Sequence, residues 1–103
     1  MLGSEMSEML TNLTQLIIRT PDPDTRKKLA KQHERLSSML QSLIDKTVDA
    51  ALPEYAAAAA ALKVANQQAE AAKKNLDKVA DAITSVADAI GKVAALVAKI
   101  AVL

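Results

Sequence analysis

The chain has 103 residues, half of them hydrophobic, with a formal net charge of +1 and no cysteine. The missing cysteines exclude disulfides, thiolate metal sites and cysteine nucleophiles, and the near-neutral charge gives no bulk attraction to nucleic acid. The apolar residues are mostly Ala, Leu, Val and Ile, and Tyr55 is the only aromatic residue. We therefore expect one all-α domain over residues 1–103, with a core made of many small helix–helix contacts.

The first helix is predicted over about residues 4–19, where apolar residues recur every three or four positions. These residues are Met6, Met9, Leu10, Leu13, Leu16 and Ile17. The helix should end at the segment 20–23, which contains two prolines. Asp22 suits the N-cap of the next helix, and Pro23 suits its first turn, where a missing N–H costs nothing. The second helix is then predicted over about 23–52.

Pro53 marks either a turn or a kink. The apolar spacing continues through it, which favours a kinked helix, but an unbroken helix from Pro23 to the end would be about 120 Å long. We therefore predict a tight turn, with Pro53 opening a third helix over about 53–101 and Glu54 complementing its dipole. The predicted architecture has three helices, with an antiparallel helical hairpin or bundle, coiled-coil-like packing and a very long alanine-rich third helix.

The third helix carries an apolar stripe whose steps alternate between three and four residues, as in helices that pack along other helices. The second helix is too short to cover it, so residues 84–103 should overhang unless a bend near Gly91 folds them back. An uncovered face of this kind calls for a partner. We expect the chain to form a dimer or tetramer through this stripe, with the main contacts made by Leu76, Val79, Ile83, Val86, Ile90, Val93, Val97 and Ile100.

A basic cluster at the start of the second helix is the candidate site for an anionic partner, such as phosphate or an acidic protein surface. It consists of Arg26, Lys27, Lys28, Lys31 and Arg35. Basic residues in the first turn of a helix interact unfavourably with its dipole, and this cost favours a role in binding an anionic partner. However, Asp22, Asp24 and Glu34 offset the charge, and no aromatic residue or glycine-rich loop accompanies it. A solvated face is the simpler interpretation, and nucleic acid is not the expected partner.

Residues for catalysis or metal binding are scarce. His33 is the only histidine, and its position between Leu29 and Leu36 favours a packing role over a base or a metal ligand. The sequence contains no phosphate loop, dinucleotide fingerprint or nucleophile elbow. We expect no enzymatic activity, no cofactor and no metal.

These features predict a non-enzymatic helical interaction or scaffold protein of the cytoplasm. One alternative is a peripheral membrane protein that uses residues 86–103 as an amphipathic helix, although that segment lacks a basic polar face and aromatic anchors. Another is a chaperone-like or antitoxin-like module that caps a different protein.

Overall fold

The computed structural model describes residues 2–44, 46 and 48–102, and it confirms the all-α fold. Its elements are α1 (Leu2–Arg19), α2 (Pro23–Ile44), α3 (Pro53–Lys74), the short 3-10 helix η1 (Leu76–Lys78) and α4 (Val79–Ala101). The four long helices form an elongated bundle that measures 43 × 20 × 18 Å. The described part of the chain thus folds into a four-helix bundle.

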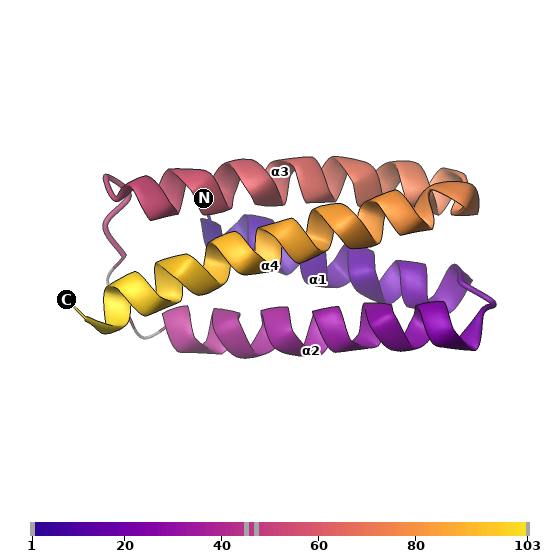
Figure 1. Ribbon diagram of the computed structural model, residues 1–103, viewed down its shortest axis with the longest axis horizontal. Helices are drawn as coiled ribbons and strands as arrows, with labels where there is room; N and C mark the ends of the chain where they lie inside the picture. The colour runs from indigo at the N-terminus through magenta and orange to yellow at the C-terminus, as the bar shows by residue number, and fades with distance from the viewer. Residues whose placement is uncertain (1, 45, 47, 103) are drawn as a thin grey trace.

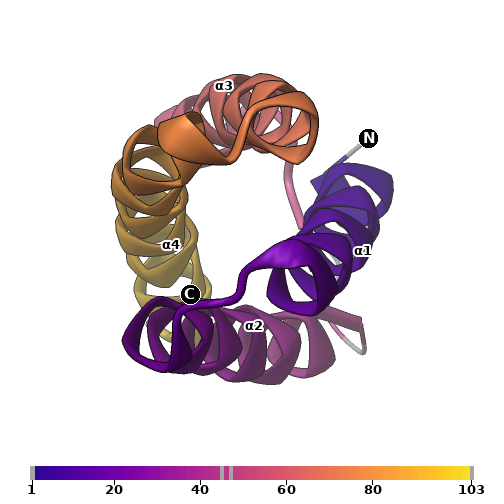
Figure 2. The same cartoon turned by 90° about the vertical axis from the view of Figure 1, so that its right-hand side faces the viewer.

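The helices run alternately in opposite directions along the bundle (Figure 1). Viewed from the end, their order around the bundle is α1, α2, α4, α3, so α2 and α3 lie diagonally opposite each other (Figure 2). α1 is therefore parallel to its neighbour α3, and α2 is parallel to α4. Gln32 of α2 shows the second pairing, because its Nε2 donates to the backbone oxygen of Ile83 in α4 at 2.9 Å.

The break between α1 and α2 is confirmed where the prolines predict it. The Thr20 hydroxyl donates to the Leu16 oxygen at 2.6 Å, which closes α1. The side chain of Asp22 accepts the backbone N–H of Thr25 at 2.9 Å, and so caps α2. Pro23 occupies the first position of α2, as expected.

The second helix is shorter than the predicted range 23–52, because α2 ends at Ile44. Positions 45 and 47 of that range lie outside the described residues. Within the connection, the Asp49 side chain accepts a hydrogen bond from the N–H of Ala51 at 2.9 Å. The backbone oxygen of Asp49 accepts one from the N–H of Leu52. These local turn bonds replace helical ones. Pro53 then opens α3, which confirms the predicted turn over the kink.

The predicted third helix over 53–101 is divided at Asn75. This residue has an extended backbone (φ −145°, ψ 102°), and its side-chain oxygen accepts the N–H of Asp77 at 3.1 Å. Asparagine competes with helical bonds in this way. The chain reverses here, and α4 lies antiparallel against α3, so residues 84–102 do not overhang (Figure 1). Gly91, the alternative place for a bend, lies inside α4.

The core combines large residues from α1, α2 and α4 with mostly small residues from α3. α1 and α2 contribute buried methionines and leucines, whereas four alanines and Leu62 line the buried face of α3. Since the distance between helices depends on the side chains at the contact, alanine allows neighbouring helices to approach α3 closely. The most extensive helix pair is α3 with α4, and α2 with α4 is the least extensive of the neighbouring pairs.

A polar network also links α1 to α3. The buried side chains of Asn12 and Asn66 share a hydrogen bond of 2.9 Å. Lys73 Nζ donates to Asn12 Oδ1 and Gln15 Oε1 at 2.8 and 2.6 Å, and it pairs with Glu70 at 2.8 Å. Buried polar groups that are paired in this way fix one alignment of two helices.

Candidate functional site

Half of the residues predicted to contact a second copy are instead buried within the bundle of the single chain. Val79, Val86, Ile90 and Val93 have between 0% and 6% of their surface exposed and belong to the core of the bundle. The break at Asn75 is the reason, because it turns the apolar stripe of α4 back onto the other helices. These four residues therefore do not line a free surface in the folded chain, and their assignment to an oligomer contact is corrected.

The other predicted contact residues are more accessible. Leu76 in η1 is 41% exposed, while Ile83, Val97 and Ile100 of α4 are half-buried and pack against the core from its margin. Ile83 and Val97 lie on the side of α4 that faces α2, where each lines a hollow with α2 residues. With the buried Ile90 between them, they form what we call the apolar edge of α4.

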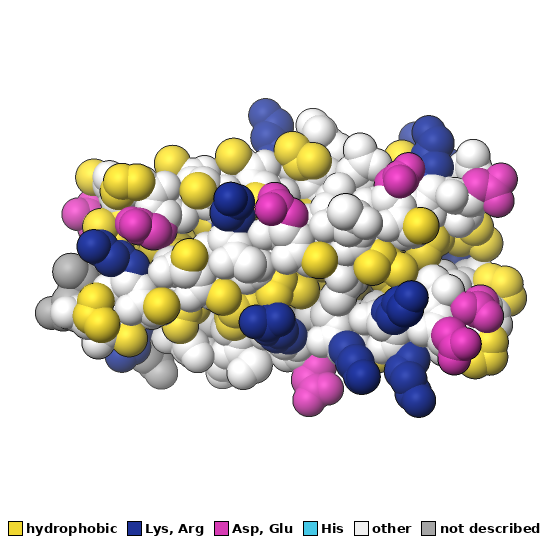
Figure 3. Space-filling view, viewed as in Figure 1, with side chains coloured by type: hydrophobic (Ala, Val, Ile, Leu, Met, Phe, Trp, Pro, Cys, Tyr) yellow, Lys and Arg dark blue, Asp and Glu magenta, His cyan; other side chains and the backbone are white. Residues whose placement is uncertain are grey.

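The exposed face of α4 is made mainly of small side chains. At 3.6 residues per turn, Gly91 lies opposite the buried side of this helix. On either side of it runs a ridge of small residues, all of them exposed except the half-buried Ala94: Ala80, Thr84, Ala87, Ala94, Ala95 and Ala98. Hydrophobic side chains gather along α4 and in the furrow between α4 and α2 (Figure 3). This face offers little steric obstacle to another helix.

The furrow between α2 and α4 contains two hollows beside the apolar edge. One of about 190 Å³ lies between Lys31, Arg35 and Ile90. The other, of about 220 Å³, lies between Leu43, Lys46 and Val97. Because α2 and α4 have the least extensive contact of the neighbouring helices, the furrow is a shallow groove with an apolar floor and basic side chains on its α2 side.

The opposite margin of the α4 face, toward α3, carries four exposed charges. Asp81 and Asp88 occupy its first half, and Lys92 and Lys99 its second half. We call these residues the charged edge of α4. None of them forms an ion pair with another described residue, since the ion pair among those residues is Lys73 with Glu70.

The predicted basic cluster is exposed on α2, but the structure does not gather its members into one site. Lys31 and Arg35 reach the α2–α4 furrow, whereas Lys28 lines a hollow at the end of the bundle. Arg26 and Lys27 are exposed and line none of these hollows. This arrangement is that of a solvated helix face rather than a pocket for one anion.

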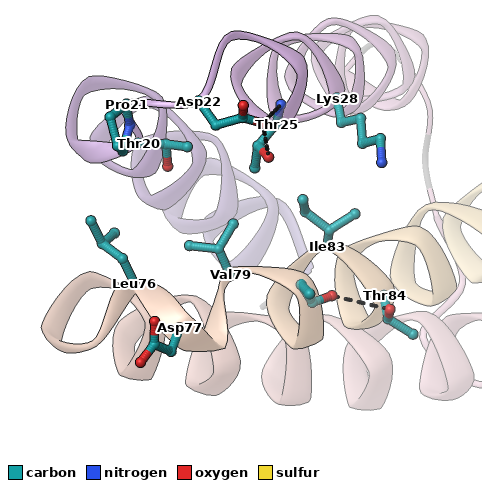
Figure 4. A pocket seen from close by; sticks show the side chains of 11 residues that line it. Thr20, Pro21, Asp22, Thr25, Lys28, Leu76, Asp77, Val79, Ile83 and Thr84 are labelled. Carbon is teal, nitrogen blue, oxygen red and sulfur yellow. Dashed lines mark hydrogen bonds between the residues drawn. The ribbon is translucent and has the colours of Figure 1, made fainter.

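The hollow at the bundle end has a volume of about 560 Å³ and lies between the start of α2 and the start of α4 (Figure 4). The hydroxyls of Thr20 and Thr84 donate to backbone oxygens four residues earlier in the chain. The Thr25 hydroxyl donates to Asp22 at 2.6 Å. This bond, with the Thr25 N–H and nearby Lys28, holds the pKa of the Asp22 carboxyl below its usual value of 3.8.

No group of three or more His, Asp or Glu residues within the described ranges could hold a metal ion. Within the same ranges, no helix has the length and hydropathy needed to cross a membrane. Sequence reasoning missed Asn12, Asn66 and Lys73, which link α1 to α3. The available signal was that each asparagine directly adjoins a residue of an apolar stripe, Asn12 beside Leu13 and Asn66 beside Ala65. No protein-family model, curated protein or solved structure matches this chain.

Proposed function

We propose that this chain is a non-enzymatic interaction protein that self-associates through the exposed face of α4. The observation that carries the proposal is the make-up of that face, which has small residues along its ridge and an apolar edge beside it. Exposed helix faces in monomers usually carry long polar side chains. Here a second helix could approach closely along the ridge and remove the apolar edge from water.

The charge of the α4 face favours a protein partner over a lipid surface. A helix that lies on a membrane carries a lysine-rich and arginine-rich polar face with aromatic anchors. The charged edge of α4 has two aspartates and two lysines, and α4 has no aromatic residue. Mixed charges of this kind suit a surface that offers the opposite charges at defined positions.

The proposal is tested by the solution mass of the protein across a dilution series. We expect the mass to approach a multiple of 10.9 kDa at high concentration. Ala98→Glu, on the exposed ridge, should keep the chain monomeric because it puts a charge into the contact. Ala60→Glu is the matched control, since Ala60 is an exposed alanine of α3. A monomer at every concentration, or equal effects of both substitutions, would contradict the proposal.

A further inference from the structure

We infer that the partner of the α4 face is the α4 helix of a second copy, packed antiparallel, with a two-fold axis that passes beside Ile90 and Gly91. This inference rests on the proposed self-association and specifies its geometry. In a two-fold pair of antiparallel helices, a residue before the axis faces the residue equally far after it in the other copy. The charged edge of one copy then faces the charged edge of the other. On the opposite side of the ridge, the two apolar edges face each other.

The charged edge has the symmetry that such a pair requires. Asp81 and Lys99 stand nine residues before and after Ile90, and Asp88 and Lys92 stand two residues before and after it. Each aspartate would therefore face a lysine of the second copy, and each such pair would occur twice. A parallel two-fold pair would instead place the charged edge of each copy against the apolar edge of the other, because an axis along the helices exchanges the two margins. Exposed ion pairs add little affinity, but charges covered by an apolar edge would lose water without gaining a partner, and this cost selects the antiparallel orientation.

The apolar edge has the same centre. Ile83 and Val97 stand seven residues before and after Ile90, and both are half-buried, with surface left to cover. In the antiparallel pair, Ile83 would face Val97 of the second copy, on either side of an axis that passes beside the buried Ile90. Two edges of one helix, one charged and one apolar, thus point independently to the same axis.

Gly91 supports this position of the axis. Glycine in the middle of a helix costs about 1 kcal/mol relative to alanine, and the fold of the single chain gives no reason for it. Its φ is not positive, and a Cβ added there would meet nothing within 4 Å. A second backbone that crosses at this point would supply the reason, because glycine permits the closest approach of two helices.

The first test uses cysteine cross-linking in a chain that has no cysteine of its own. Gly91→Cys should form a disulfide-linked dimer under mild oxidation, because the two copies of residue 91 meet near the axis. Thr84 and Ala98 are exposed ridge residues placed seven positions before and after Gly91. Thr84→Cys alone and Ala98→Cys alone should therefore remain unlinked, while an equal mixture of the two variants should cross-link.

The second test exchanges charges. Asp81→Lys should weaken the dimer roughly 2- to 30-fold, since it opposes lysine to Lys99 of the second copy at two symmetric places. Adding Lys99→Asp should restore the affinity. Asp81 and Lys99 lie at opposite ends of one α4, about 27 Å apart, so this rescue can only act between chains. Circular dichroism checks that both variants stay helical.

The outcomes separate this inference from the proposed function. If Thr84→Cys alone cross-links as readily as the mixture, or if the double exchange does not rescue, the chain self-associates in another orientation and the inference is wrong. If the unmodified protein is a monomer at every concentration, the proposed function fails as well.

Discussion

At the scale of single residues, the hydrogen-bonded side chains of Asn12 and Asn66 should contribute to the stability of the fold as one unit. Asn66→Ala leaves the Asn12 amide without its 2.9 Å partner, and an unsatisfied buried polar group costs about 1–3 kcal/mol. We expect that loss in the free energy of unfolding measured with urea. Asn12→Ala combined with Asn66→Ala should cost clearly less than the sum of the two single changes. Strict additivity would show that the pair does not act as a unit.

Asp22 should make the stability of the bundle depend on pH in the acid range. Its folded pKa lies below the usual value of 3.8, first because the Thr25 hydroxyl and N–H donate to it. A depressed folded pKa means that the stabilisation is present above about pH 3.8 and is lost as the pH falls through the folded pKa. Asp22→Asn keeps a capping oxygen but does not titrate. Thermal unfolding between pH 2 and 6 should therefore show a weaker acid dependence for this variant than for the unmodified protein.

At the scale of helices, Asn75 should hold the α3–α4 reversal in place. Asn75→Ala removes the side-chain bond to the Asp77 N–H and substitutes the strongest helix former at the break. We expect a loss of about 0.5–2 kcal/mol, the usual cost of removing a capping side chain. Lys74→Ala, at the neighbouring exposed position, is the control and should change stability little. An Asn75→Ala variant as stable as the control would mean that packing alone sets the reversal.

The sequence predicts some helix boundaries and not others for a physical reason. Pro23 and Pro53 are visible as boundaries because proline can occupy a first helical turn but not a helix interior. Asn75 stands in a run of good helix formers, and asparagine is only a weak breaker without a glycine or proline beside it. Besides the Asn75 cap, the reversal gains from the packing of α4 against α3, a contact between distant parts of the chain. Local sequence carries no direct signal of that gain.

At the scale of the molecule, the sequence identifies the apolar stripe of α4 but not what covers it. Heptad spacing shows that Val86 and Val93 face a helix, and the structure shows that this helix belongs to the same chain. Heptad spacing is the same whether the covering helix belongs to the same chain or to another one, because the spacing reflects only which residues are buried. The candidate surface lies on the other side of α4. It is recognised only once the fold shows which alanines remain exposed.

The same reasoning predicts opposite effects of one substitution on the single chain and on the pair. Gly91→Gln should raise the stability of the monomer by up to about 1 kcal/mol, since glutamine is a better helix former than glycine. It should also weaken the dimer, because its side chain occupies the place where the second backbone approaches. For the unmodified protein the unfolding temperature should rise with concentration, as binding stabilises the folded state by mass action. The unfolding temperature of Gly91→Gln should be higher than that of the unmodified protein at low concentration, and it should change little as the concentration rises. Gly3→Gln in α1, where an added side chain likewise meets open space, should keep the concentration dependence. If Gly91→Gln keeps it too, the crossing point of the two helices does not lie at Gly91.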